Sequence, residues 1–142
     1  MRRRWAAWLV LLALAAGCGT APAERPADSS LERHLLRGVA QIRTTRDKEK
    51  LHAELARTLA SLRQDRASTA AGRRAKTLAI EGFEWTRKGV RSQLDFEEND
   101  SGNVAAATRD AIRADRFLTR GANRLRAAGS LLGVRVGRLR GH

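Results

Sequence analysis

The chain has 142 residues, of which 28 are Lys or Arg and 15 are Asp or Glu, giving a formal net charge of +13. This length accommodates one domain with a modest hydrophobic core and leaves too little chain for a second. Its single cysteine excludes an intrachain disulfide, and its positive charge predicts attraction to anionic lipid head groups, cell-wall polyanions or nucleic acid.

Residues 1–17 have the layout of an export signal. Three arginines at positions 2–4 precede an uncharged apolar run from Trp5 to Ala16. The run has about a dozen residues, whereas a helix that spans a bilayer needs roughly 20. A secretory signal peptide therefore explains the segment better than a permanent transmembrane helix. An ordinary signal peptide with an incidental Cys18, or a cytosolic protein with an apolar start, are the alternatives.

The apolar run ends in Ala15-Ala16-Gly17-Cys18, which resembles the lipobox of bacterial lipoproteins, where small residues precede an invariant cysteine. The resemblance covers only the signal segment, and Ala15 stands where the commonest lipobox has Leu. It implies that the Cys18 sulfur carries a diacylglycerol group and that cleavage leaves Cys18 as the N-terminus. We therefore expect a lipoprotein exported and anchored to the bacterial cell membrane, on its outer face or periplasmic side.

The remaining chain divides into a tether, a domain and a tail. Residues 18–28 are expected to form the lipidated cysteine and a flexible tether, because Pro22 and Pro26 oppose a helix. Residues 29–133 are predicted to form a helical bundle. Residues 134–142, which carry three arginines among glycines, are expected to form a frayed basic tail.

The chain from Ser29 to the turn expected at Ala67–Ala71 predicts a long first helix, with Ser29 and Glu32 matching a capping box. Two apolar runs follow at helical spacing. They are Leu31, Leu35, Val39 and Ile42, and then Leu51, Leu55, Leu59 and Leu62. At about 100° per residue, the gap between the runs turns the apolar face by half a revolution. We expect one long helix with a kink, because no Gly or Pro interrupts it; a break near Thr44–Asp47 would make the total four helices.

The second predicted helix carries a seam of small residues at alternating spacings of four and three. The seam consists of Ala71, Ala75, Leu78, Gly82, Trp85, Gly89, Ser92 and Phe96. Because Gly in a helix interior costs about 1 kcal/mol relative to Ala, Gly82 and Gly89 predict a neighbouring helix that approaches closely. Trp85 between them is interpreted as a core anchor rather than a ligand platform.

Residues 97–103 predict a polar turn. As a calcium loop with Gly102 at the glycine position of an EF-hand, it would need a carboxylate at Thr108, so the metal interpretation fails. A third helix is predicted from about Asn103 to Leu132. Asp115 lies on its apolar seam, and a buried carboxylate requires a partner. We expect an ion pair with an Arg of another helix.

The predicted fold is therefore all-α, an antiparallel up-down-up bundle of three long helices. The sequence offers little chemistry. His34 and His52 would lie about 27 Å apart on a continuous helix and could not share a metal. No metal-ligand pair, cysteine cluster or glycine-rich phosphate loop occurs, and Glu97 and Glu98 lie in a turn without a nearby histidine. We expect no enzyme activity, no cofactor and no metal site.

These observations predict a lipid-anchored, non-enzymatic envelope protein that acts through protein–protein contacts or by adhering to anionic lipid or cell-wall polymers. Export disfavours nucleic acid as the partner, and the aromatics after Cys18 are not interleaved with basic residues as in single-strand binders. The alternative is a basic helical nucleic-acid-binding protein with an unprocessed N-terminus. A third hypothesis is a solute or enzymatic pocket between helices, with Asp115 facing a void.

Overall fold

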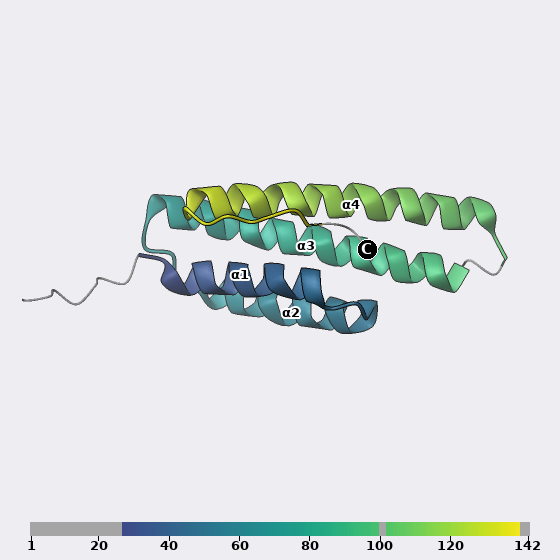
Figure 1. Ribbon diagram of the computed structural model, residues 1–142, viewed down its shortest axis with the longest axis horizontal. Coiled ribbons are helices and arrows are strands. Elements are labelled where there is room, and N and C mark those ends of the chain that lie inside the picture. Colours follow the sequence, from purple (N-terminus) through teal and green to yellow (C-terminus); the bar gives the residue numbers. More distant parts are fainter. Residues whose placement is uncertain (1–26, 100–101, 140–142) are drawn as a thin grey trace, which may run out of the picture.

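The computed structural model describes residues 27–99 and 102–139. These residues form four helices, α1 (Ser29–Thr44), α2 (Lys48–Gln64), α3 (Ala70–Asn99) and α4 (Val104–Leu131). Figure 1 shows a short α1–α2 hairpin packed along part of a longer α3–α4 hairpin. The predicted all-α class is confirmed, but the described chain has four helices rather than the favoured three. None of these helices is both long and apolar enough to cross a bilayer.

The first predicted helix is broken at residues 45–47, where Asp47 caps α2 by accepting a hydrogen bond from the Lys50 backbone N–H at 2.9 Å. The half-revolution between the two apolar runs is the physical reason. A continuous helix would expose one run, whereas a reversal turns both toward one core. All eight residues of the two runs are at most 6% exposed. The absence of Gly and Pro was therefore the weaker signal.

Polar contacts at three levels hold α1 antiparallel to α2. His34 Nδ1 lies 2.6 Å from the Asp65 carboxylate, and the Thr58 hydroxyl donates to the Gln41 side chain at 2.9 Å. Near the turn, the Thr45 hydroxyl donates to the Glu54 carboxylate. His34 and His52 therefore lie on the two helices of a hairpin and not on one continuous helix.

The predicted capping box at Ser29 and Glu32 is wrong. Asp28 is the N-cap of α1, with φ +68°, and its carboxylate makes no capping bond in its own helix. It reaches the start of α3 instead, where the backbone N–H and hydroxyl of Ser68 donate to it at 2.6 and 2.9 Å. The Thr69 hydroxyl donates at 2.5 Å. Gly72 leaves the room for this contact, because a Cβ there would overlap the carboxylate.

The close approach predicted at Gly82 and Gly89 is confirmed. A Cβ on Gly82 would lie 2.7 Å from the Leu125 side chain, and one on Gly89 would lie 2.7 Å from Leu118. The reciprocal small residue on α4 is Gly121, where a Cβ would lie 2.8 Å from the Gly82 carbonyl oxygen. These missing side chains let the backbones of α3 and α4 approach closely around the three glycines.

The α3–α4 hairpin extends past the α1–α2 hairpin, which leaves its far end as a two-helix arm (Figure 1). Val104 and Ile112 on this arm are 83% and 49% exposed. Asp115 is also exposed, so the predicted buried ion pair is wrong. The buried seam of the arm passes through Ala107 and Ala114, one residue before the predicted position of Asp115. Only α3 covers α4 there, so the buried face is narrow.

The C-terminal segment packs on the bundle as far as the structure describes it. Val136 is 8% exposed, and the Val134 backbone N–H donates to the Gly129 carbonyl oxygen at 2.9 Å. Farther along, the space at Gly137 is filled by the Arg43 side chain of α1. Val134, Val136 and Leu139 pack against the core, so residues 134–139 lie against the helical bundle.

Candidate anion-binding surface

A row of arginines runs along the outer face of α4. Arg109, Arg113, Arg116 and Arg120 follow at spacings of four, three and four, which places them on one face over about 16 Å. With Ile112 and Phe117 they line a surface hollow of about 380 Å³. Arg113 pairs with Asp110 at 3.4 Å, but the other three arginines form no ion pair with a carboxylate among residues 27–99 and 102–139.

An aromatic pair adjoins this row at the α3–α4 boundary. The rings of Trp85 and Phe117 lie 5.2 Å apart between centroids at an interplanar angle of 34°. The Lys88 ammonium lies 4.7 Å from the Trp85 ring centroid, and the Arg120 guanidinium carbon lies 5.3 Å from it. Both cations are thus within cation–π range of one indole.

The interpretation of Trp85 as a core anchor is wrong, because its side chain is only half-buried. The seam against α4 passes from Gly82 to Gly89 through Thr86, which is 3% exposed. A Cβ on Gly121 would overlap the Thr86 hydroxyl oxygen, so a tryptophan cannot occupy the interface at this level. Trp85 therefore lies at the rim of the interface, against Phe117.

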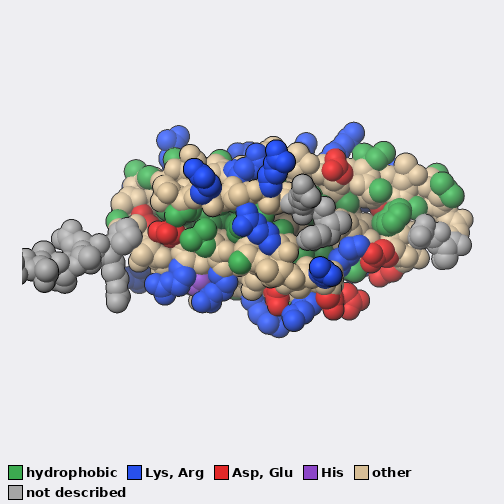
Figure 2. Space-filling model, viewed as in Figure 1, with side chains coloured by type: hydrophobic (Ala, Val, Ile, Leu, Met, Phe, Trp, Pro, Cys, Tyr) green, Lys and Arg blue, Asp and Glu red, His purple; other side chains and the backbone are tan. Residues whose placement is uncertain are grey.

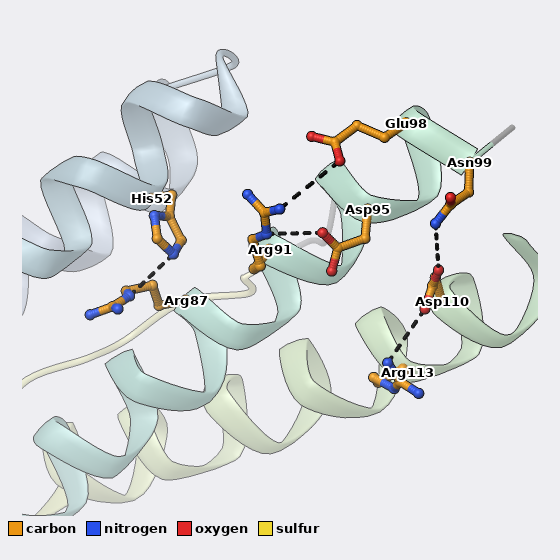
Figure 3. Close-up of polar contacts among 8 residues, drawn as sticks. All are labelled: His52, Arg87, Arg91, Asp95, Glu98, Asn99, Asp110 and Arg113. Atoms are coloured by element: carbon orange, nitrogen blue, oxygen red, sulfur yellow. Dashed lines mark hydrogen bonds and ion pairs between the residues drawn. The ribbon is translucent and has the colours of Figure 1, made fainter. Parts of the chain in front are cut away.

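A second hollow, of about 420 Å³, lies between α2 and α3 on the other side of Lys88. It is lined by His52, Arg63, Glu84, Arg87, Lys88 and Arg91. Figure 3 shows Arg87 reaching from α3 toward His52 of α2, and its Nε–H donates to His52 Nε2 at 3.2 Å. Burial, with the positive charges of Arg87 and Arg91, holds the pKa of His52 below its usual 6.5. The neutral ring can accept this hydrogen bond.

Carboxylates balance only part of the charge of this hollow. Glu84 pairs with Arg63 at 2.7 Å, and Arg91 pairs with Asp95 at 2.9 Å and more loosely with Glu98 at 4.0 Å. Figure 3 shows Asp95 and Glu98 approaching Arg91 from the distal turns of α3. These exposed ion pairs add little stability. Their main effect is to orient the guanidinium groups.

Lys88 joins the two hollows, since it lines one and stacks on the indole that contacts the other. We call the joined surface the basic belt. It consists of His52, Arg63, Trp85, Arg87, Lys88, Arg91, Arg109, Arg113, Arg116, Phe117 and Arg120. The belt crosses α2, α3 and α4. On the face that Figure 2 presents, Lys and Arg side chains are spread over much of the surface, whereas acidic side chains form smaller separate groups.

The other residues singled out from the sequence do not converge on the belt. Cys18 lies outside the described residues. Glu97 pairs with Lys48, and Asp115 lines with them a cavity of about 320 Å³ beside the α1–α2 turn. No three His, Cys, Asp or Glu side chains within the described ranges are placed to hold a metal ion.

Sequence reasoning missed the belt because its aromatics come from two helices. A usable signal was present, since Trp85 precedes Lys88 and Phe117 precedes Arg120 by the same three residues. On a helix, residues three apart share a face. The described residues thus form a small four-helix domain with a basic, partly aromatic surface. Comparison with models of known protein families, with curated proteins and with solved structures finds no match.

Proposed function

We propose that this chain is a lipid-anchored, non-enzymatic helical protein of the bacterial envelope. It binds an anionic lipid surface through its basic belt. The observation that carries the proposal is the arginine row of α4, in which three of four guanidinium groups are left without a described carboxylate partner. Guanidinium forks match phosphate oxygens in geometry and charge.

The aromatic pair supports a lipid surface in particular. Trp85 and Phe117 are half-buried beside the arginines, and Ile112 is 49% exposed next to them. Tryptophan and arginine suit the head-group region, because each presents an apolar body and a polar tip. The exposed apolar groups beside the arginines give this surface a part that can enter the head-group region.

The expected anchor and the belt can act on one bilayer. The ten residues from Cys18 to Asp28 span at most about 35 Å when extended. The C-terminal end of α4 lies beside the start of α3, which Asp28 contacts, and Arg120 follows about 16 Å along α4 from Leu131. Acyl chains combined with a basic surface give the two signals that stable membrane attachment requires.

The belt is tested by co-sedimentation of the full chain with vesicles of phosphatidylglycerol and phosphatidylcholine. The belt variant replaces Arg109, Arg113, Arg116 and Arg120 by Gln. The matched control replaces four exposed arginines outside the belt, Arg33, Arg37, Arg57 and Arg66, and has the same net charge. We expect the belt variant to lose most of its preference for anionic vesicles and the control to keep it. Equal losses would show that only net charge matters.

A second candidate is the nucleic-acid-binding protein with an unprocessed N-terminus, and the aromatic pair between cations favours it. Single-strand binders combine a positive groove with aromatic stacking. The intact mass of the native protein separates the two candidates. A chain beginning at Cys18 with a diacylglyceryl group supports the envelope protein, whereas an unmodified chain beginning at Met1 supports the nucleic-acid binder.

A further inference from the structure

We infer that the hollow between α2 and α3, around His52 and Arg87, is a binding site for a single phosphate group. This inference rests on the proposed function, since it names the ligand class of one end of the basic belt. The hollow is concave, with a volume of about 420 Å³, and it draws side chains from two helices. It therefore differs from the open arginine row of α4.

The charges of the hollow favour a ligand with two negative charges. Four cations line it, Arg63, Arg87, Lys88 and Arg91, against the single carboxylate of Glu84. Glu84 is engaged by Arg63, and the partners of Arg91 lie on the distal turns of α3. Arg87 and Lys88 form no ion pair with a described carboxylate. A phosphate between them supplies the missing charge.

Arg87 is positioned to receive an oxyanion. Its Nε–H is held by His52 Nε2 at 3.2 Å, which fixes the plane of the guanidinium group from one side (Figure 3). Its terminal nitrogens have no hydrogen bond to any described residue. A guanidinium binds two phosphate oxygens with parallel N–H donors. A fixed Arg87 loses less side-chain freedom when it does so.

His52 gives the site a proton-linked signal. The charged groups that face it are those lining the hollow, namely Arg63 on its own helix and Glu84, Arg87, Lys88 and Arg91 on α3. Burial and the positive charges of Arg87 and Arg91 oppose protonation of the imidazole. A bound phosphate dianion offsets this positive field, so protonation of the imidazole costs less. Phosphate binding should therefore raise the pKa of His52.

The test is NMR titration of the histidine side chains in the full chain, in an uncharged detergent, with inorganic phosphate against chloride at constant ionic strength. His52→Gln identifies the His52 signal. We expect saturating phosphate to raise the pKa of His52 by about one unit, as an opposite charge within a few ångströms does. Arg87→Gln should weaken phosphate binding about tenfold or more, the effect of removing a charge-assisted hydrogen-bond pair.

Arg109→Gln is the matched control, because it removes the same charge from the α4 row. An unchanged pKa of His52 in phosphate, or an equal loss of affinity in both variants, would overturn the inference. Vesicles that contain phosphatidic acid distinguish the source of the phosphate. A shift of the His52 signal with both probes assigns a lipid head group, and a shift with inorganic phosphate alone assigns free phosphate.

The same measurements separate this inference from the proposed function. Phosphate binding at His52 by a chain that ignores anionic vesicles leaves the inference standing and removes the membrane role. Vesicle binding that depends on the α4 row, with no response of His52 to phosphate, leaves the membrane role standing and removes the inference.

Discussion

The ammonium group of Lys88 lies 4.7 Å from the centroid of the Trp85 ring, and this contact joins two basic hollows into one surface. Neither residue is unusual alone. Trp85 lies at the rim of the α3–α4 interface because α4 passes too close at Gly82 and Gly89 to admit it. The close packing of the hairpin thus shapes the surface, since it leaves an indole among the cations.

The first prediction concerns this indole. Trp85→Ala removes the stacking on Phe117 and the surface that Lys88 and Arg120 cover. We expect a loss of about 2 kcal/mol in the free energy of unfolding, less than for a fully buried tryptophan. Denaturant unfolding followed by circular dichroism measures it. Trp85→Phe should lose less than half as much stability as Trp85→Ala. An equal loss in the two variants would contradict a stabilising role for the ring stacking.

The second prediction concerns the contact between α3 and α4. Gly121→Ala places a methyl group against the Thr86 hydroxyl oxygen and 2.8 Å from the Gly82 carbonyl oxygen. Because that carbonyl belongs to the backbone and moves little, we expect a loss of about 2 kcal/mol despite the better helix propensity of Ala. Gly102→Ala is the control, since a Cβ at that position would have no described atom within 4 Å. A stable Gly121→Ala variant would show that the helices can separate cheaply.

The third prediction follows from Asp28. Hydrogen bonds from Thr69 and Ser68 lower the pKa of its carboxyl group from 3.8 to about 2. The unfolded chain then binds a proton at a higher pH than the folded chain does. The contribution of Asp28 to stability is complete above about pH 4 and is lost as the pH falls toward 2.

Thermal unfolding midpoints between pH 6 and 2 measure this effect. We expect Asp28→Asn to lower the midpoint at pH 6 and to flatten its decline below pH 4, because the amide does not titrate. A variant whose decline parallels that of the wild type would place the acid sensitivity in other carboxylates.

The fourth prediction concerns His52, whose pKa is held below 6.5 by burial and by Arg87 and Arg91. As the pH falls through 6.5, the unfolded chain gains a proton that the folded chain resists, so stability declines. His52→Gln should show a smaller loss of stability between pH 7.5 and 5.5 than the wild type in denaturant titrations. Equal losses would mean that the ring titrates normally in the folded state.

The sequence was most informative where apolar spacing decided the structure. The leucine runs of α1 and α2 are buried as their spacing predicts, and the glycines of α3 mark the close approach of α4. The break at residues 45–47 was visible in the phase of the two runs but carried no Gly or Pro to mark it. The change of apolar face between the two runs is a stronger signal than the absence of Gly and Pro, because exposing four large apolar side chains costs several kcal/mol.

The errors arose where tertiary contacts decide. Asp115 and Trp85 fit a heptad seam by spacing, yet the true seam runs one position away from each of them, through Ala114 and Thr86. Spacing alone does not fix which of two adjacent stripes a neighbouring helix covers. Asp28 bonds to the start of α3, forty residues along the chain, and no local pattern predicts such a partner. The belt depends on the same kind of long-range placement.

The proposal of a lipid anchor assisted by a basic belt is tested most directly by salt extraction of native membranes that contain the wild-type chain or Cys18→Ala. We predict that the wild type stays with the membranes in low salt and in 1 M NaCl, where the Debye length is about 3 Å. Cys18→Ala should be largely soluble, and any part retained in low salt should be released by 1 M NaCl. Release of the wild type by salt, or retention of Cys18→Ala in 1 M NaCl, would contradict the proposal.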